Sequence, residues 1–368
     1  MFIKSVRLDG YRNYTEFQTD FSEGVNVITG NNAQGKTNLL EALFFLAAGR
    51  SFRSVREKEL IGFDSGYAGI SSAFFSGGRE QIIEVTLRRD RKKEITVNAV
   101  KIKKAAELSG RLRCVLFCPD DLSLVKDGAA VRRRLMDTCL CQLRPRYAAE
   151  LSEFGRLYEH KTRILRDRRE KPSLLETLDD YDLRLAQKSA ELIYFRAHFV
   201  KLLAEKAAAV HSEFTGGAEK LNIRYKTVST IDDAVNKRPA ELLPLLLEHQ
   251  EAHKRAELES GLCLSGAHKD DLEIEINGET ARSFASQGQA RTAALSIKLS
   301  ERDIHYDDGG EYPVLLLDDV LSELDAGRQN FVLNRIRGGQ VFITCCGEAD
   351  IAERTGGRVI RISGGKAV

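Results

Sequence analysis

The sequence has no apolar run that approaches the roughly 18 residues that a membrane-spanning helix needs. Its first residues, Met1 to Val6, alternate like a strand and lack the apolar core of a secretory signal peptide. These absences argue against a membrane protein and against an exported one. We expect a soluble cytoplasmic protein without a membrane partner.

Disulfide and zinc-finger patterns are also missing. The seven cysteines are odd in number and show no Cys-x-x-Cys spacing, as is typical of a reducing compartment where cysteine fills the core. The close pairs Cys139/Cys141 and Cys345/Cys346 have no partner pair at finger-like spacing, so we expect no cysteine metal site. Internal repeats and low-complexity linkers are absent as well.

Charge is present in both signs but unevenly distributed. A length of 368 residues allows one domain with a large insertion, and the formal net charge is only +2. Residues 88–171 nevertheless hold 23 Lys or Arg and 12 Asp or Glu, so this segment carries +11 and the remainder −9. Such polarity suits a polyanionic partner, with Arg132 and Arg133 as candidate phosphate contacts, whereas a solvated surface is the simpler alternative.

One stretch predicts nucleotide binding. The sequence GNNAQGKT stands between a short apolar run, 25–29, and a helical pattern, 38–48. A strand, a glycine loop and a helix in this order are typical of a P-loop, in which Lys36 reaches the terminal phosphates and Thr37 ligates Mg²⁺. The helix N-terminus adds partial positive charge. The predicted loop contacts are Gly30, Asn31, Asn32, Ala33, Gln34, Gly35, Lys36, Thr37 and Asn38, and Arg12 is expected near the loop.

The hydrophobic periodicity predicts the other elements. The segments at 67–75, 80–88 and 94–102 are expected to form an antiparallel sheet beside the nucleotide core. Further strands are predicted at 2–8, 25–29, 114–117, 221–225, 271–277, 313–319 and 341–344, and helices over 129–215, 242–258 and 290–301.

An apolar seam marks the last helix of the 129–215 region. Leu178, Leu185, Leu192 and Phe199 recur every seven residues, and Lys188 interrupts the seam. This pattern predicts packing in a helical bundle, with a short coiled-coil arm as the alternative.

Two further segments complete the predicted site. The apolar run 313–319 ends in Asp318 and Asp319, at the strand edge where open α/β sheets place their chemistry. We predict that Asp318 holds Mg²⁺ together with Thr37 and that Asp319 orients or deprotonates the attacking water. About thirty residues before Asp318, Ser286 opens a helix whose N-terminus can receive a γ-phosphate.

These segments stand in the order of an ABC-type ATPase head, which binds ATP and Mg²⁺. In such heads the signature segment, here Ser286–Gln289, contacts the γ-phosphate that is bound by the other protomer. We therefore expect an α/β fold: an ABC-type P-loop head, 1–120 plus 262–368, with an antiparallel β subdomain and an inserted helical lobe, 121–261. The predicted catalytic residues are Asp319 and Lys36, and further nucleotide contacts are Ser286, Gln287, Gly288, Gln289 and Asp325.

Over essentially its whole length the chain resembles the RecF family of recombination mediators, in the SMC-like branch of the ABC ATPases. The resemblance implies an ATP-dependent homodimer that clamps duplex DNA near single-strand gaps and helps RecO and RecR load RecA in repair, replication restart and the SOS response. It also implies slow, DNA-stimulated ATP hydrolysis that releases the dimer, and a nucleoid-associated location. Besides the P-loop and the acidic strand, the matching segments are Gly49–Arg53, Phe117–Leu122, Arg132–Asp137, Gly266–Asp271 and Phe284–Thr292.

Some features depart from related ATPases or leave alternatives open. The segment 343–345 lacks the histidine with which many transporter heads sense the γ-phosphate, and His268 is expected to be structural. The Gln of the usual Q-loop is not identified, and the turn 117–122 is its expected place. A transporter ATPase subunit, a small-molecule P-loop kinase and an SMC-like head acting as a structural DNA clamp are the alternatives.

Overall fold

The computed structural model describes residues 1–54, 56–103, 105–345 and 349–368, so Cys346 lies outside the described residues. The chain divides into two compact units: Met1–Ser123 with Lys298–Val368, and Leu124–Ile297. None of the described helices combines the length and the hydropathy that a membrane crossing requires.

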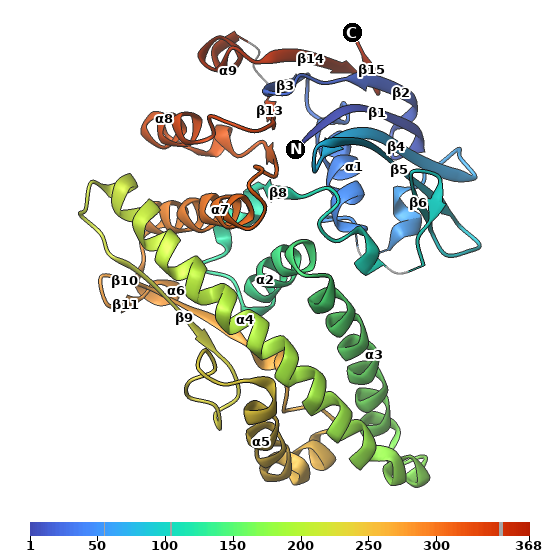
Figure 1. Cartoon of the computed structure of the whole chain (residues 1–368), viewed down its shortest axis with the longest axis vertical. Coiled ribbons are helices and arrows are strands. Elements are labelled where there is room, and N and C mark those ends of the chain that lie inside the picture. Colours follow the sequence, from blue (N-terminus) through green and yellow to red (C-terminus); the bar gives the residue numbers. More distant parts are fainter. Residues whose placement is uncertain (55, 104, 346–348) are drawn as a thin grey trace. The chain divides into compact units, whose positions relative to one another are not determined.

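A mainly parallel sheet forms the centre of the first unit (Figure 1). Its inner strands are buried on both faces, which explains why they appear in the sequence as continuous apolar runs. The strands predicted at 25–29, 114–117, 313–319 and 341–344 are confirmed. From edge to edge the strands are β15 (Lys366–Ala367), β14 (Arg358–Ser363), β3 (Val25–Thr29), β13 (Val341–Cys345), β12 (Val314–Asp318) and β8 (Cys114–Phe117).

An antiparallel sheet forms the second layer of this unit. Its strands alternate between buried and exposed residues, as expected for a sheet with one face on the core. The segment predicted at 94–102 belongs to this sheet and forms a hairpin, in which Asn98 and Ala99 turn with φ values of 50° and 63°. In order, the strands are β2 (Tyr14–Asp20), β1 (Phe2–Tyr11), β4 (Tyr67–Ser76), β5 (Arg79–Arg88), β6 (Glu94–Val97) and β7 (Val100–Lys101).

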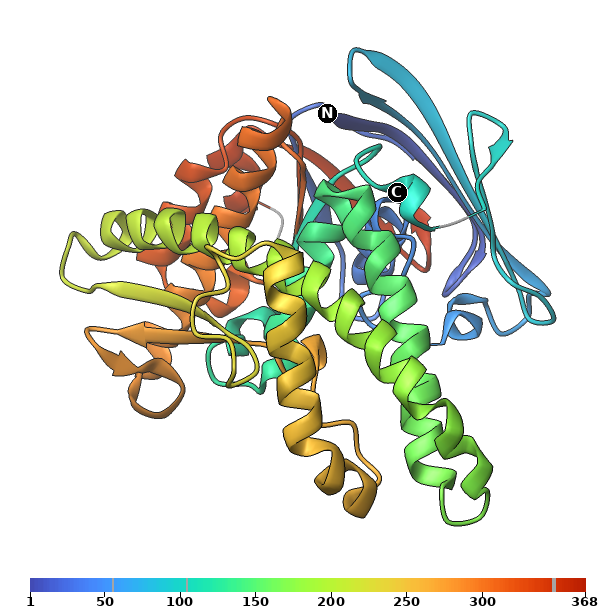
Figure 2. The same ribbon diagram turned by 60° about the horizontal axis from the view of Figure 1, so that its bottom comes forward.

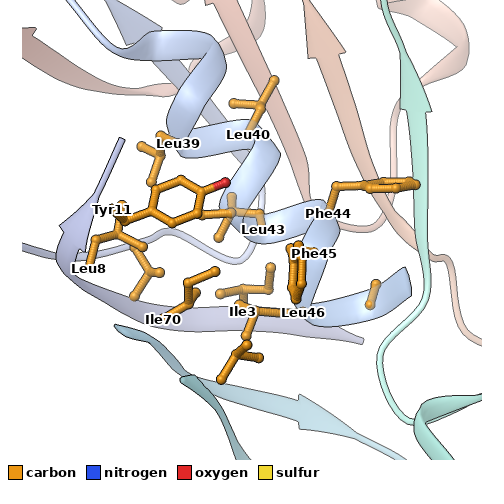
Figure 3. Close-up of a cluster of buried hydrophobic side chains, with 14 of the residues drawn as sticks. Ile3, Leu8, Tyr11, Leu39, Leu40, Leu43, Phe44, Phe45, Leu46 and Ile70 are labelled. Atoms are coloured by element: carbon orange, nitrogen blue, oxygen red, sulfur yellow. The ribbon is translucent and has the colours of Figure 1, made fainter. Parts of the chain in front are cut away.

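The helix α1 (Lys36–Ala48) is buried between the two sheets. Its residues 39–47 are apolar on almost every face, which is the pattern of a fully buried helix. Figure 3 shows Leu39 of α1 beside Tyr11, and Leu46 of α1 beside Ile3, of the antiparallel sheet. The core therefore fixes the helix whose first turn carries Lys36 and Thr37. The remaining helices of this unit are α8 (Ala326–Arg335) and α9 (Ala349–Thr355), with short 3₁₀ turns at Glu57–Leu60, Ala105–Leu108, Pro119–Ser123 and Leu321–Glu323.

The second unit is mainly helical, as predicted for 129–215. Pro145 lies in the first turn of the helix Pro145–Asp167, as is typical of proline. Gly216 follows the helix Leu178–Thr215 with a φ of 61°, as is typical of a glycine that ends a helix. A small sheet has the order β11-β10-β9, formed by Glu279–Thr280, Asp271–Ile276 and Leu221–Lys226. The helices are α2 (Ala129–Leu143), α3 (Pro145–Asp167), α4 (Leu178–Thr215), α5 (Pro239–Ser260), α6 (Ala281–Phe284) and the first part of α7 (Gln287–Gly309), with 3₁₀ turns at Pro172–Thr177 and Ala267–Lys269.

The apolar seam of α4 packs in a bundle. Leu178, Leu185, Leu192 and Phe199 are all buried, and α4 contacts α3 and α5, which lie beside it (Figures 1 and 2). Lys188, which interrupts the seam, pairs with Glu150 and Glu153 of α3 at 2.9 and 3.0 Å. The bundle interpretation is therefore confirmed, and the charged interruption serves as a link between two helices.

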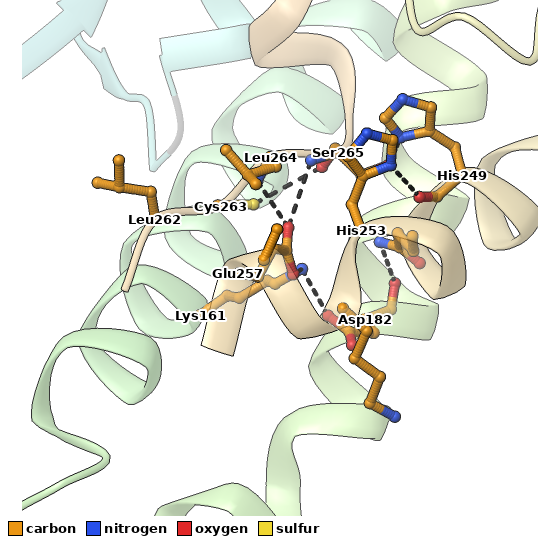
Figure 4. Close-up of polar contacts among 12 residues, drawn as sticks. Lys161, Asp182, His249, His253, Glu257, Leu262, Cys263, Leu264 and Ser265 are labelled. Carbon is orange, nitrogen blue, oxygen red and sulfur yellow. Dashed lines mark hydrogen bonds and ion pairs between the residues drawn. The ribbon is translucent and has the colours of Figure 1, made fainter. Parts of the chain in front are cut away.

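A buried ion cluster joins three helices of this bundle. Lys161 of α3 is fully buried, and its ammonium lies 2.7 Å from carboxylate oxygens of both Asp182 on α4 and Glu257 on α5 (Figure 4). The Glu257 carboxylate also accepts the backbone N–H of Leu264 at 2.6 Å. Since an unpaired buried charge is very costly, this cluster specifies how α3, α4 and α5 pack.

The two units do not coincide with the head and the lobe expected from the sequence. The predicted lobe spans 121–261, and the second compact unit spans 124–297. The two divisions differ mainly over 262–297, because the boundary between the units falls inside α7. The division into head and lobe stays a prediction.

Candidate nucleotide site

Two glycines shape the loop between β3 and α1. Gly30 has a φ of 146°, and a Cβ there would lie 2.3 Å from the carbonyl oxygen of Ile362. Gly35 has a φ of 114°, and a Cβ there would lie 2.7 Å from the side chain of Asn13. A larger residue at either position would collide with its neighbours, so the tight loop requires glycine.

The ammonium of Lys36 lies across this loop. Lys36 is only 8% exposed, and its Nζ donates to the carbonyl oxygens of Gly30 at 2.6 Å and Asn31 at 3.0 Å. A cation held by the carbonyls of a glycine loop fits a phosphate ligand, because phosphate oxygens are stronger acceptors for the same ammonium. The ammonium of Lys36, the predicted phosphate-binding group, therefore lies against the backbone of the P-loop.

The predicted metal ligands lie together. The hydroxyl of Thr37 donates to Oδ1 of Asp318 at 2.9 Å, and Asp318 is 5% exposed at the end of β12. Burial raises the pKa of the Asp318 carboxyl, and the hydrogen bonds from Thr37 and Thr344 oppose this effect. A hydroxyl and a carboxylate are oxygen donors of the kind that Mg²⁺ prefers. These two residues therefore fit Mg²⁺, which when bound would neutralise phosphate charge.

Asp319 follows directly, with a φ of 53°. The hydroxyl of Ser322 donates to its carbonyl oxygen at 2.7 Å and to its Oδ1 at 3.0 Å. Its backbone N–H donates to the hydroxyl of Thr344 at 2.8 Å. The Asp319 carboxylate is thus held next to the predicted metal ligand Asp318. Unlike Asp318, Asp319 is partly exposed, so a water molecule can reach it, as a water-orienting group requires.

Arg12 lies beside α1, where it is bound by other groups. Its guanidinium donates to both carboxylate oxygens of Glu41, at 2.9 and 2.8 Å, to Oγ of Ser54 at 2.6 Å and to the carbonyl oxygen of Glu59 at 3.0 Å. Glu41 is fully buried in α1 and also accepts a hydrogen bond from Ser51 at 2.6 Å. Direct nucleotide contact by Arg12 stays a prediction, since it would require exchange of these partners.

Two neighbours of the loop, Asn13 and Arg53, were not among the predicted nucleotide contacts. Asn13 donates to the carbonyl oxygen of Gln34 at 2.9 Å and accepts from the side chain of Asn38 at 2.8 Å. Arg53 donates to Oδ1 of Asn38 at 2.9 Å, and its positive charge opposes part of the rise in the pKa of Asp318 that burial causes. Arg53 ends the segment Gly49–Arg53 that carries part of the family resemblance, but no spacing rule places it or Asn13 at the P-loop.

The signature segment lies in the second unit and caps its own helix. The Oγ of Ser286 accepts the N–H of Gln289 at 3.2 Å, and Oε1 of Gln289 accepts the N–H of Ser286 at 2.9 Å. This reciprocal pair is a capping box. The Gln289 amide also donates to Glu219 at 3.0 Å, while Ser286 and Gln287 are exposed and Gly288 is half-buried. Their action on a nucleotide stays a prediction.

Asp325 and His268, the other two residues considered in the sequence analysis, make contacts that stabilise the local fold. Asp325 caps α8 by accepting the N–H of Arg328 at 3.0 Å, and it pairs with the guanidinium of the same arginine. The backbone hydrogen bond from Arg328 is the main cause of the lowered pKa of Asp325. His268 bonds the carbonyl oxygen of Cys263 at 3.0 Å and packs against the ring of Tyr158, which fits the structural role expected for it.

The basic segment 88–171 is divided between the two units, with residues 88–123 in the first and 124–171 in the second. Arg132 is 3% exposed and binds both carboxylate oxygens of Asp271, at 2.7 and 2.9 Å. Arg133 donates to the carbonyl oxygen of Asp270 at 2.7 Å, whereas Arg134 is exposed. The suggestion that Arg132 contacts phosphate from the surface is therefore wrong, and Arg134 is the residue of this run that faces solvent.

Comparisons with known proteins agree over nearly the whole chain. A family model described as the RecF/RecN/SMC N terminal domain matches residues 2–363. The DNA replication and repair protein RecF of Acetivibrio thermocellus is 38% identical over 94% of this chain and 93% of its own length. The RecF of Clostridium acetobutylicum is 38% identical over 100% of this chain and 99% of its own. A solved structure of the recombination mediator protein RecF with ATPrS superposes with a TM-score of 0.92 at 33% identity, covering 99% and 97% of the two chains.

Proposed function

The chain belongs to the RecF family, and on this basis we propose that it is an ATP-binding, ATP-hydrolysing protein of DNA replication and repair that acts as a recombination mediator. The observation that carries the proposal is the hydrogen bond between Thr37 and Asp318, which Lys36 and Asp319 adjoin in the sequence. This arrangement joins a phosphate-binding loop to the two carboxylates that hydrolysis requires.

Each of these residues has one role in the proposed mechanism. Lys36 exchanges its loop carbonyls for phosphate oxygens, and Thr37 and Asp318 hold Mg²⁺. Asp319 orients the attacking water and accepts its proton. The site thereby separates metal binding from water activation, although the two carboxylates are adjacent in the sequence.

We further propose that ATP closes a homodimer. The exposed Ser286 and the N-terminus of α7 would meet the γ-phosphate bound by the second copy, in a site completed by two chains. The closed dimer clamps duplex DNA near single-strand gaps, assists RecO and RecR in loading RecA, and reopens after slow, DNA-stimulated hydrolysis. The support is the full-length relationship to RecF proteins together with the capped, solvent-exposed start of α7.

A gel-shift titration tests this proposal. Duplex, gapped and single-stranded DNA are titrated with the chain, with and without ATP, and the Lys36→Met variant serves as the control that lacks the phosphate-binding charge. We expect ATP to tighten binding to duplex and gapped DNA only in the parent. Equal DNA affinity with and without ATP would contradict the clamp. If ATP tightens DNA binding but a parallel assay detects no ATP hydrolysis, the result would favour an SMC-like head that acts as a structural DNA clamp.

A further inference from the structure

The backbone of Asp319 is held in a strained conformation. Its φ of 53° lies in the left-handed region, which is unfavourable for a residue with a Cβ. Such a conformation persists only where the surroundings fix it. Two hydroxyl groups contact this backbone, one from Thr344 and one from Ser322.

Thr344 joins the two adjacent carboxylate residues through a single hydroxyl. It lies on β13 opposite Asp318 in the strand register and is 2% exposed. Its oxygen accepts the N–H of Asp319 at 2.8 Å, and the hydroxyl donates to Oδ1 of Asp318 at 3.0 Å. One lone pair and one proton of the same group are thus both used inside the site.

The same carboxylate oxygen also accepts the bond from Thr37. Oδ1 of Asp318 therefore has hydroxyl donors from two elements, α1 and β13, at 2.9 and 3.0 Å. On the other side of the turn, Ser322 bonds both the carbonyl oxygen and the carboxylate of Asp319. The orientation of the two carboxylates is consequently set by three hydroxyl groups, and Thr344 alone contacts both residues among the interactions described.

We propose that Thr344 is a positioning residue for ATP hydrolysis, an inference that rests on the proposed function. Its hydroxyl keeps Asp318 directed toward Thr37 and holds Asp319 in the turn from which its carboxylate meets the attacking water. A valine has nearly the same shape but can neither accept the N–H of Asp319 nor donate to Asp318. It would leave a buried N–H unsatisfied and release the turn.

Two substitutions at this position form a matched pair. In Thr344→Val we expect kcat to fall about 10- to 100-fold, with KM changed less than about threefold, because the loss concerns positioning of a catalytic group. Thr344→Ser retains the hydroxyl and should restore kcat to within about threefold of the parent. Thermal melting of both variants checks the fold. A purely structural role would not separate kcat from KM, nor distinguish serine from valine.

A third variant keeps the test sharp if Thr344→Val does not fold. Ser322 is exposed, so Ser322→Ala removes the other restraint on Asp319 with little risk to the core. It should lower kcat while KM stays near the parental value. Parental kcat in Thr344→Val or in Ser322→Ala, or equal losses in the valine and serine variants, would overturn the proposal.

Failure of the proposed function gives a different result. If the parent chain itself shows no turnover, ATP hydrolysis is refuted, and Thr344 is then tested by ATP binding at increasing Mg²⁺. Thr344→Val should raise the Mg²⁺ concentration for half-maximal ATP binding, because Asp318 loses one of the two hydroxyl groups that orient it. An unchanged midpoint would overturn the inference.

Discussion

Glu41 is the residue on which the segments around the P-loop helix converge. It is fully buried, and it binds Arg12, which precedes the loop, and Ser51, which follows the helix. In the sequence, a single carboxylate among the apolar residues 39–47 indicates that Glu41 has a charged partner, because an unpaired buried charge would be very costly. Its partners lie far away in the sequence, however, and no spacing rule identifies them.

Glu41→Gln should therefore destabilise the fold. The substitution keeps the shape but leaves Arg12 without its counter-charge, and we expect the free energy of unfolding to fall by about 2–4 kcal/mol. Urea denaturation measures the change. The control is Glu16→Gln, which removes an exposed partner of Arg7 and should leave the free energy of unfolding close to the parental value. Similar values for the two variants would mean that the Glu41 pair is not a stabilising contact.

His268 predicts how stability depends on pH. Burial lowers the pKa of its imidazole to about 4, whereas in the unfolded chain it has an ordinary value near 6.5. Between these values the unfolded chain binds the extra proton, so stability is lost as the pH falls from about 6.5 to about 4, by up to about 1.4 kcal/mol per pH unit. Burial also lowers the pKa of His305, to about 3.

The His268→Gln variant checks this. Unfolding measured between pH 4 and pH 7 should show a slope smaller by about one proton, while His305 maintains part of the acid sensitivity. If parent and variant have parallel profiles, His268 is not among the groups whose protonation destabilises the fold.

Among the helices and strands, those with a strong hydrophobic periodicity can be predicted from their own residues. The prediction fails for elements whose structure depends on contacts with residues that are distant in the sequence. The P-loop, the helices of 129–215 and the acidic strand could be predicted because their own residues specify them. The strands β2 and β14 were missed, since they lie toward the edges of their sheets and contain many exposed polar residues. The bond from Thr344 to Asp318 spans 26 residues and depends on the register of two strands.

The first turns of α2 test the distinction between a buried and an exposed arginine. Arg134→Glu changes only the surface, so the melting temperature should hold, while affinity for duplex DNA falls and its salt dependence decreases by about 0.9 per lost phosphate contact. Arg132→Glu places a negative charge against Asp271 in a buried site and should lower the melting temperature markedly.

Gel shifts at several salt concentrations, together with thermal melting, give both readouts. Parental DNA affinity in Arg134→Glu would remove α2 from the DNA-contacting surface. A parental melting temperature in Arg132→Glu would mean that the pair with Asp271 is dispensable.

For the whole molecule, the proposed two-chain site separates assembly from turnover. Ser286→Arg places a bulky side chain at the exposed start of α7, so it should prevent ATP-dependent dimers while ATP still binds. Asp319→Asn retains Thr37 and Asp318 but loses the carboxylate that activates water, so its dimer should form and persist, with turnover reduced about 10²- to 10⁴-fold. Light scattering with ATP decides: a monomeric Asp319→Asn or a dimeric Ser286→Arg would refute the two-chain site.

The bonds of Lys36 to the carbonyls of Gly30 and Asn31 have a consequence for the cost of binding. Through these bonds the ammonium links the helix to the first residues of the loop, and it helps to hold the loop in its folded conformation. Nucleotide arrival then replaces one set of oxygen acceptors with another instead of ordering a flexible segment. The loop's conformational entropy is therefore lost during folding of the chain, and more of the binding energy of ATP is left for work elsewhere in the protein.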